Sequence, residues 1–485
     1  MSTSVYNMLS RTKEKLQTRE PGKVAMYVCG MTTYDSMHVG HARCFLVFDV
    51  IRRYLEWRGQ EVIHVQNVTD IDDKVITRAE ELGVDPLGLA ERYHLESVDD
   101  CLTFGLLPPN VMSKATDHVD EIINIITDLC ARGFAYCVES GVYFDVSRYE
   151  EDYPYGELSG RDRGELLAGA RLEVDDRKDD PMDFALWKTA KPGEPSWKSP
   201  WGDGRPGWHI ECSAMSLKYL GPGFDIHGGG TDLIFPHHEN EIAQSQAHTE
   251  VRPAVRQWLH SGVVTVDGVK MSKSLGNIIN LRDALNKHGA NEIKLAFLQT
   301  SYRTPVDYSE TKIEAARTAL GRLGATLAAV DDSTVVLGGD ATPKTSSLSD
   351  TLVQASGSTR KQFVEAMDDD FNTARAIAAI FDLVSKMNKF IRGLETSASN
   401  VADMEAFRTS GDTVRELLGV LGINELGERV EVPELTEKLI EFLITLRSDL
   451  RAQKLFEVAD RIRDDLQDLG IVLEDKSGGT TWRLE

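Results

Sequence analysis

The order of apolar and polar positions predicts an α/β fold in the first part of the chain. The apolar run VAMYVC predicts a strand over residues 24–29, and a helical pattern begins near His38. Asp35 or Ser36 is expected to cap this helix. A second apolar run, VIHVQNV, predicts another strand that ends next to Thr69. Strand, helix and strand in this order predict a parallel sheet in which ligands bind at the carboxyl ends of the strands.

The rest of the pattern divides the chain further. An Asp-, Pro- and Gly-rich stretch separates two halves of the sheet fold, and long helical patterns follow after it. We therefore expect an α/β protein with a Rossmann-type doubly wound parallel sheet, an insertion, a helical region and a small C-terminal α/β piece. The expected segments are 1–110 and 206–308 for the two sheet halves, 111–205 for the connective insertion, 309–350 for a contact region with a linker, 351–425 for the helical region and 426–485 for the C-terminal piece.

Composition and charge narrow the class of protein. The chain has 485 residues, of which 41% are hydrophobic, and this is enough for a sizeable core in several domains. It contains neither a long apolar stretch nor the apolar core of a signal peptide, so we expect a cytoplasmic protein without a membrane partner. The formal net charge of −23 argues against nonspecific nucleic-acid binding, because phosphate contacts need Lys and Arg. A specific nucleic-acid partner is compatible with a local basic groove.

The start of the first predicted helix carries a candidate phosphate site, the sequence HVGH at residues 38–41. Unpaired N–H groups and the helix dipole favour phosphate at such a position. His38 and His41 share one face of the helix, so both could contact phosphates. Gly40 would let an adenine ring approach the backbone. On its own, a match of four residues is as compatible with an ordinary helix start.

A second candidate phosphate site is the sequence KMSKS at residues 270–274, which follows a short strand pattern. Lys270 and Lys273 could clamp a triphosphate and neutralise the charge that builds up on departing pyrophosphate. The alternative is a solvated basic loop. Together and in this order, the two motifs resemble the HIGH and KMSKS signatures of class I aminoacyl-tRNA synthetases. That class activates an amino acid as an adenylate and then esterifies the terminal adenosine of tRNA.

Two of the six cysteines belong to a candidate metal site, whereas the other four are typical of small buried residues. Cys29 ends the first predicted strand, and Cys212 lies in the segment GWHIECS. His237 and Glu241 are four residues apart, which places them on one face of a helix. Two thiolates, an imidazole and a carboxylate form a plausible tetrahedral zinc set. The spacing is not that of a CxxC motif, and His238 shows that histidine is locally plentiful, so the sequence leaves a structural role open.

Longer segments make the resemblance specific. YVCGMTTYD, TDIDDK, GWHIECS, HGGGTD, FPHHENEIAQS and KMSKSLGN are similar to segments of the cysteinyl-tRNA synthetase family, and the similarity extends over nearly the whole chain. The resemblance implies L-cysteine, ATP with Mg²⁺ and tRNA(Cys) as substrates, one zinc ion per chain and a monomer. It also implies roles for particular residues: Cys29, Cys212, His237 and Glu241 as zinc ligands, Thr69 and Trp208 in the amino-acid pocket, and Gly230, Asp232 and Lys273 at the adenylate and ATP.

The same resemblance implies that the last two segments recognise the anticodon and that the region 309–350 contacts the tRNA stem. In the C-terminal piece, Arg451, Phe456, Asp460 and Asp475 occupy positions at which the family contacts anticodon bases. Some members carry Trp where this chain has Phe456, and a phenyl ring stacks on a base over a smaller area.

Three alternatives remain at this point. A mycothiol ligase joins cysteine to an amino sugar through the same adenylate, but its counterpart of FPHHENE lacks the carboxylate of Glu241 and it ends before the last helical segment. Another class I synthetase with a structural zinc would leave the four-residue donor set unexplained. An inactive relative that serves as a binding module would not need intact HVGH and KMSKS sequences.

Overall fold

The computed structural model describes residues 3–162, 164–165, 178–271, 275–332, 347–394, 401–424, 434–452, 455–468, 471–476 and 479–484. The chain forms two compact units, residues 1–424 and residues 425–485. None of the described helices combines the length and the apolar character that a membrane-spanning helix requires.

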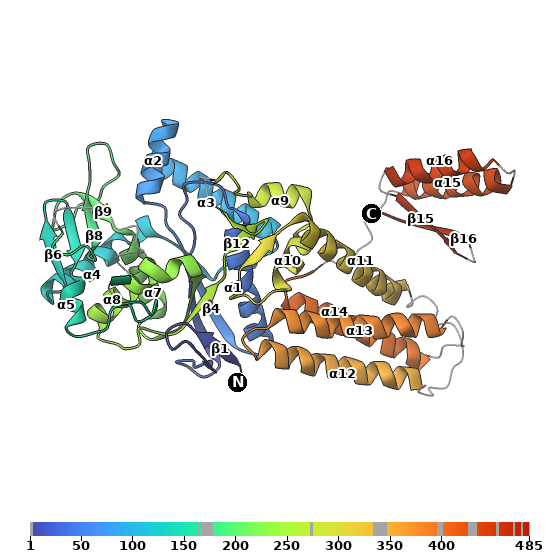
Figure 1. The fold of residues 1–485 in the computed structure, drawn as a ribbon, viewed down its shortest axis with the longest axis horizontal. Helices are drawn as coiled ribbons and strands as arrows, with labels where there is room; N and C mark the ends of the chain where they lie inside the picture. Colours follow the sequence, from blue (N-terminus) through green and yellow to red (C-terminus); the bar gives the residue numbers. More distant parts are fainter. Residues whose placement is uncertain are drawn as a thin grey trace. The chain divides into compact units, whose positions relative to one another are not determined.

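A parallel sheet of five strands in the order β11-β10-β3-β4-β5 forms the centre of the first unit (Figure 1). Its strands are β3 (Lys23–Val28), β4 (Glu61–Val68), β5 (Val111–Lys114), β10 (Phe224–Gly230) and β11 (Val255–Ser261). Every neighbouring pair in this sheet is parallel. The helices α1 (Val39–Trp57), α2 (Asp73–Leu82), α3 (Pro86–Thr103), α7 (Trp208–Leu220) and α8 (Glu239–Thr249) lie between these strands in the sequence. The predicted doubly wound α/β class is confirmed.

The insertion forms a sheet of its own, which the sequence pattern did not predict. Its four antiparallel strands have the order β6-β7-β8-β9, with bounds β6 (Ala135–Val138), β7 (Gly141–Phe144), β8 (Phe184–Thr189) and β9 (Gly204–Pro206). The helices α4 (Val119–Ala131) and α5 (Val146–Glu150) and the 3₁₀ turn η1 (Ala115–His118) accompany it. A core that includes Ile122, Phe144 and Trp187 continues into α7 at Ile210, so the insertion packs against the second sheet half.

Two smaller sheets complete the α/β part. The hairpin of β1 (Ser4–Asn7) and β2 (Thr12–Lys15) precedes the first long strand. A three-stranded sheet with the order β13-β12-β14 contains β12 (Val264–Val266), β13 (Val269–Lys270) and β14 (Val306–Tyr308). The chain leaves β11, forms β12 and β13, and then enters the predicted KMSKS loop, so this sheet presents that loop.

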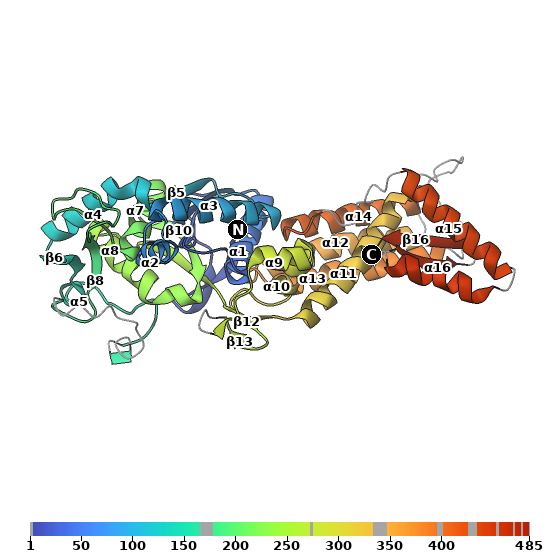
Figure 2. The same ribbon diagram turned by 90° about the horizontal axis from the view of Figure 1, so that it is seen from above.

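Helices make up the rest of the first unit, and Figure 1 and Figure 2 show the last four of them side by side next to the sheet domain. The helices are α9 (Leu281–Lys287), α10 (Ala290–Leu298), α11 (Glu310–Asp332), α12 (Ser347–Met367), α13 (Thr373–Leu394) and α14 (Val401–Val420). This helical region is joined to α1 by polar contacts: Asp368 accepts hydrogen bonds from Tyr54 (2.8 Å) and Arg58 (3.0 Å), and Trp57 Nε1 donates to Glu416 (3.0 Å).

The second unit contains α15 (Glu434–Ala452), α16 (Phe456–Asp468) and the hairpin of β15 (Ile471–Lys476) and β16 (Gly479–Leu484). Helices and strands are therefore both present, as expected for a small C-terminal α/β piece. Helix α16 contacts both α15 and β15, so the unit has its own packing.

Candidate active site

A cavity of about 330 Å³ opens at the carboxyl ends of β3, β4 and β10. This is the edge at which a doubly wound sheet binds its ligands. The cavity brings together sequence-predicted residues from both sheet halves. Its lining includes Cys29, His38, Gly40, His41, Thr69, Trp208, Gly230, Asp232, His237 and Lys270. Lys273 lies outside the described residues.

The HVGH turn begins α1 with its two imidazoles stacked, the ring centroids 3.6 Å apart. The helix cap is His38 itself, and not Asp35 or Ser36 as expected: His38 Nδ1 accepts a hydrogen bond from the His41 N–H at 3.2 Å. In return, the His38 N–H donates to His41 Nδ1 at 3.4 Å. Burial, with smaller effects from His38 and Lys74, lowers the pKa of His41 well below its usual value. His41 is therefore a neutral hydrogen-bonding group at neutral pH, while its ring lines the cavity.

Gly40 is closely packed on two sides. A Cβ atom at this position would lie 3.0 Å from the His38 ring and 3.1 Å from Met271 Cε, at the beginning of the KMSKS loop. The glycine therefore allows α1 and the segment after β13 to approach each other. Lys270, the last residue of β13, reaches the same cavity.

The four predicted metal donors lie within 4.8 Å of one another, although they come from positions far apart in the sequence. The sulfur atoms of Cys29 and Cys212 are 3.8 Å apart, and Cys29 Sγ is also 3.8 Å from Glu241 Oε1. His237 Nε2 is 3.0 Å from Glu241 Oε1. All four side chains are buried. Cys29 follows β3, Cys212 lies on α7, Glu241 lies on α8, and His237 lies in the turn η3 (Ile234–His238) that leads into α8.

These distances fit a zinc ion. Two sulfurs bound to a tetrahedral zinc at about 2.3 Å are separated by about 3.8 Å, which is the separation found here. Thiolate, imidazole and carboxylate are also the donor types that zinc prefers. A structural disulfide is a poor explanation, because that bond would bring the sulfurs to about 2.05 Å.

The charges of the cluster support the same interpretation. Burial alone would raise the pKa of Cys212, but its contacts with Cys29 and with His237 outweigh burial and lower that pKa to about 6. Against burial, Glu241 and Cys212 raise the pKa of His237 to about 10. His227 and His237 lower the pKa of Glu241 to about 2, again against burial. The metal-free cluster thus holds anionic and cationic groups in contact, as a cation site does when protons replace the metal.

Further histidines surround the donors, and sequence reasoning assigned them no role. His227 Nε2 lies 2.9 Å from Glu241 Oε2, and His238 Nε2 lies 3.3 Å from Cys29 Sγ. His238 Nδ1 in turn contacts His260 Nε2 at 2.8 Å. Such partners orient ligands and tune their basicity. The signal that could have revealed them is the presence of histidine near the ends of β10 and β11, the same sheet edge.

The predicted amino-acid pocket adjoins the donors. The Trp208 ring stacks on His237 with a centroid separation of 4.3 Å, at the first residue of α7. Thr69 follows β4 and accepts a hydrogen bond from Asn67 Nδ2 on its Oγ1 (3.2 Å). Asp232 lies in the turn η2 (Thr231–Leu233), directly after Gly230. A Cβ atom at Gly230 would lie 2.3 Å from Asp232 Oδ1, so the glycine leaves room for this carboxylate at the cavity.

The C-terminal candidates belong to the second unit. Arg451 Nη1 and Asp460 Oδ1 form an ion pair at 3.1 Å, and the Arg451 guanidinium lies 5.9 Å from the centre of the Phe456 ring. The Phe456 side chain is about half exposed. Asp475 lies in β15, opposite Thr480 of β16. Three of the four candidates therefore gather around the junction of α15 and α16.

The parallel sheet, the histidine turn of α1 and the cavity between them define a class I aminoacyl-tRNA synthetase, and known proteins agree. A family model described as the class I (C) tRNA synthetase catalytic domain matches residues 15–318, the DALR domain matches residues 362–425, and the cysteinyl-tRNA ligase anticodon binding domain matches residues 433–483. Among solved structures, the methionyl-tRNA synthetase of Mycobacterium tuberculosis in complex with methionyl-adenylate shares the fold. Its TM-score is 0.63 at 17% identity, with 87% of this chain and 94% of that chain covered.

Curated relatives narrow the class to one family. The cysteine–tRNA ligase of Heliobacterium modesticaldum is 48% identical over 484 residues, with 100% of both chains covered. That of Thermococcus onnurineus is 46% identical over 487 residues, with 100% of this chain and 99% of the relative covered. The chain belongs to the cysteine–tRNA ligase family, which confirms the resemblance found in the sequence.

Proposed function

We propose that the protein activates L-cysteine with ATP, releasing pyrophosphate, and transfers the cysteinyl group from the adenylate to the 3′ end of tRNA(Cys). The observation that carries this proposal is the cavity itself, since one end is formed by metal-donor side chains and the other by the stacked histidines of α1. An amino acid held at the first end would present its carboxylate toward a nucleotide held at the second.

We propose Cys29, Cys212, His237 and Glu241 as the ligands of one Zn²⁺ ion. Bound there, zinc would act as a Lewis acid that favours the thiolate form of the cysteine side chain. The hydroxyl group of serine does not ionise in the same way at neutral pH. This chemistry matters because serine and cysteine differ in one atom. A pocket selecting by fit alone discriminates between such near-isosteres by only about 10².

The remaining site residues orient the reactants in this proposal. Trp208 and Thr69 shape the amino-acid end, and Gly230 with Asp232 borders the adenylate. His38 and His41 hold phosphate oxygens by hydrogen bonds, since at least His41 is neutral. Lys270 and Lys273 neutralise the charge that develops on departing pyrophosphate. ATP binds together with Mg²⁺. Hydrogen bonds and charges directed at the developing charge stabilise the transition state of adenylate formation.

The rest of the chain would recognise the tRNA. We propose that residues 309–350 contact the tRNA stem, that residues 351–425 form a helical anticodon-binding domain and that residues 426–485 read anticodon bases through Arg451, Phe456, Asp460 and Asp475. The match of residues 433–483 to an anticodon-binding model supports this assignment. We also propose that the enzyme is a cytoplasmic monomer.

The alternatives are less well supported. A mycothiol ligase would lack both the carboxylate of Glu241 and the matched C-terminal domain, whereas this chain has both. A purely structural zinc would not need donors that line the cavity, as Cys29 and His237 do. An inactive binding module would not need the paired histidines of α1 at the same cavity.

The decisive experiment measures zinc content together with ATP–pyrophosphate exchange. We expect about one zinc per chain and exchange that depends on cysteine, with serine as the control. Cysteine-selective exchange by protein without stoichiometric zinc would overturn the metal assignment. Absence of exchange in zinc-loaded protein would favour the inactive module.

A second experiment tests the C-terminal segment. Removal of residues 425–485 should leave cysteine-dependent exchange intact, because the cavity belongs wholly to residues 1–424. Charging of tRNA(Cys) should fall, because the proposed base contacts are lost. Unchanged charging would mean that the segment has another role.

A further inference from the structure

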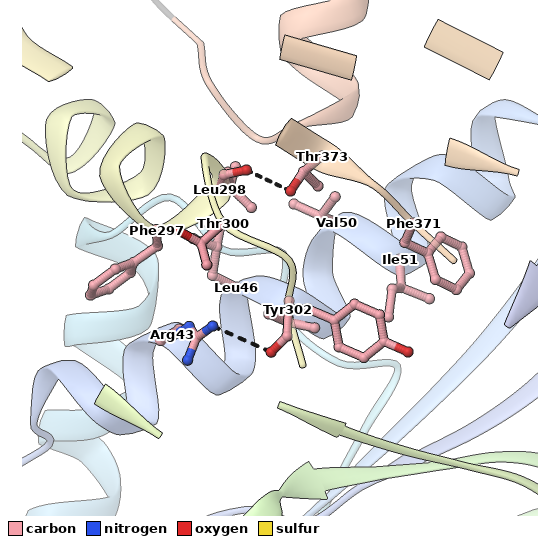
Figure 3. A pocket seen from close by; sticks show the side chains of 11 residues that line it. Arg43, Leu46, Val50, Ile51, Phe297, Leu298, Thr300, Tyr302, Phe371 and Thr373 are labelled. Carbon is pink, nitrogen blue, oxygen red and sulfur yellow. Dashed lines mark hydrogen bonds between the residues drawn. The ribbon is translucent and has the colours of Figure 1, made fainter. Parts of the chain in front are cut away.

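Arg43 of α1 is buried and forms hydrogen bonds with chain segments far from it in the sequence. Neither the HVGH nor the KMSKS motif includes this residue. It lies two residues after His41, and its side chain is 1% exposed. Its guanidinium donates to five backbone carbonyls, those of Gly262, Val263, Ser301, Tyr302 and Thr304. Among the described residues it has no carboxylate partner. Figure 3 shows Arg43 reaching from α1 to the segment that contains Tyr302.

Two of the five carbonyl groups come from residues that line the cavity of the candidate active site. Arg43 Nη1 donates to Gly262 at 2.6 Å and to Val263 at 3.0 Å, and both residues line this cavity. Strand β12 begins directly after them and leads through β13 to Lys270. Arg43 therefore connects the helix that carries His38 and His41 with the strand that presents the KMSKS loop.

The other carbonyls belong to the segment 298–304, which links α10 to β14. Arg43 Nη2 donates to Ser301 at 3.4 Å and to Tyr302 at 3.3 Å. The same segment is bound from its other side by the first residue of α13. Thr373 Oγ1 donates to the Leu298 carbonyl at 2.6 Å (Figure 3). The segment is thus hydrogen-bonded to α1 on one side and to α13 on the other.

The contacts between segment 298–304 and the start of α13 form a junction, and Asp370 belongs to it. It accepts hydrogen bonds from the Tyr302 hydroxyl (2.9 Å), from Arg303 Nε (2.8 Å) and from the Tyr6 N–H (2.8 Å). Asp370 and Phe371 both have positive φ, 62° and 48°, which is costly for residues with a side chain. Two consecutive residues in this conformation persist only where surrounding contacts hold them. The junction is therefore a strongly determined geometry.

We propose that Arg43 is a positioning residue for adenylate formation. It sets the distance between the histidine turn of α1 and the strand that leads to the KMSKS loop. It also connects both of these to α13 through segment 298–304. The proposal rests on the proposed function. The physical reason is the free-energy cost of burying a guanidinium group that has no carboxylate partner. A buried guanidinium without a carboxylate partner is tolerated only because its N–H groups are satisfied by carbonyls at fixed positions. These fixed acceptors hold three chain segments in one arrangement.

The test compares Arg43→Lys with a matched control on the same helix, Arg53→Lys. Arg53 is also largely buried, and it donates to Asp49 (2.6 Å) and Gly105 (3.2 Å), away from the cavity. Lysine keeps the charge at each position but cannot reach several carbonyls at once. A misplacement of about 1 Å far from the reacting atoms costs roughly 10²-fold in rate. We expect Arg43→Lys to lower kcat of cysteine-dependent exchange by about that factor and to raise KM for ATP.

Zinc content and KM for cysteine should stay unchanged in Arg43→Lys, because the thiol end of the cavity does not touch Arg43. Arg53→Lys should retain the exchange kinetics of the unaltered protein. Equal kinetics in the two variants would overturn the proposal, and so would a loss of zinc in proportion to activity in Arg43→Lys. If the unaltered protein shows no cysteine-dependent exchange, the proposed function fails instead.

Tyr302→Phe keeps the test decisive if Arg43→Lys does not fold. This variant removes only the hydroxyl that donates to Asp370, on the far side of segment 298–304. We expect a few-fold rise in KM for ATP with unchanged zinc content. An unchanged KM for ATP in Tyr302→Phe would show that the junction does not influence the nucleotide site.

Discussion

The metal-donor cluster and the C-terminal candidate residues place charged groups in opposite surroundings. Cys212 and Glu241 are 1% and 3% exposed. The pKa of Cys212 is lowered by its contacts with Cys29 and His237, and the pKa of Glu241 is lowered by its contacts with His227 and His237. The side chains of Arg451 and Asp460 are 44% and 45% exposed, and their ion pair faces solvent. The members of a buried cluster depend on one another for their geometry and charge, so removing one member should disable the whole site. Exposed residues act more independently, so their loss should have graded effects.

The difference follows from the ligands. A single sulfur atom can be selected only by a site that is already ordered and dehydrated. A nucleic-acid base presents a large flat surface, and an exposed aromatic ring can stack on it. We therefore expect all-or-none effects at the cavity and partial effects in the second unit.

The largest expected effect comes from Cys212→Ser, which exchanges the sulfur for oxygen with little change in volume. Substitutions of groups that merely support metal ligands already cost about 10–100-fold. Loss of a ligand should therefore reduce both bound zinc and cysteine-dependent exchange to the limit of detection. The matched control is Cys137→Ser, because Cys137 is exposed on the insertion sheet. A Cys212→Ser protein that retains zinc and exchange would remove the contrast between the two regions.

The second effect separates the two ends of the cavity. Lys273→Ala removes one cation from the KMSKS loop, and loss of a group that stabilises transition-state charge typically costs about 10²–10³-fold in kcat. We expect the exchange rate to fall by this factor while zinc content stays at one per chain. Metal analysis and exchange kinetics on the same preparation provide the measurement. A parallel fall of zinc and activity would indicate misfolding.

The third prediction concerns the pH dependence of zinc binding to metal-free protein. The pKa of His237 is raised to about 10, so its imidazole carries a proton at neutral pH that zinc must displace. The pKa of Cys29 is raised by burial and by its contact with Cys212, so its thiol releases a second proton. Both protons leave more easily as pH rises, so the apparent zinc affinity should increase more than about tenfold per pH unit between pH 6 and 8.

Titration of the metal-free protein against a zinc buffer, with proton release measured calorimetrically in two buffers, tests this prediction. A pH-independent affinity would mean that the donors are already deprotonated without metal.

Local patterns accounted for much of the fold and for the positions of the candidate residues. The strand before Cys29 and the helix after His38 can be predicted from the sequence, because apolar periodicity and short motifs depend only on neighbouring residues. The donor types made Cys29, Cys212, His237 and Glu241 a plausible zinc set, and the family resemblance implied that they act together as ligands. Spacing alone could not do so, since their proximity depends on how distant strands align.

Other features could not be read from the sequence for physical reasons. The acceptors of Arg43 are backbone carbonyls, which every residue possesses, so no side-chain pattern marks them. The sequence pattern does not mark the insertion sheet, because its strands are short and Asp-, Pro- and Gly-rich stretches flank β8. General preference favours Asp35 or Ser36 as the cap of α1, but the His38 imidazole accepts the hydrogen bond of the His41 N–H and is the cap instead.

The smallest expected effect lies in the second unit and concerns Phe456→Ala. A stacked base contributes about 1–3 kcal/mol, and a phenyl ring offers a smaller area than an indole, so we expect roughly a tenfold rise in KM for tRNA(Cys). Cysteine-dependent exchange without tRNA should not change. The matched control is Phe442→Ala, because Phe442 is 62% exposed in the same unit but lies on α15, outside the group formed by Arg451, Phe456 and Asp460. Equal effects of the two substitutions on tRNA charging would mean that Phe456 acts only as general apolar surface. A loss of charging to the detection limit in Phe456→Ala would show that this exposed region is as all-or-none as the buried cluster, and the contrast between them would fail.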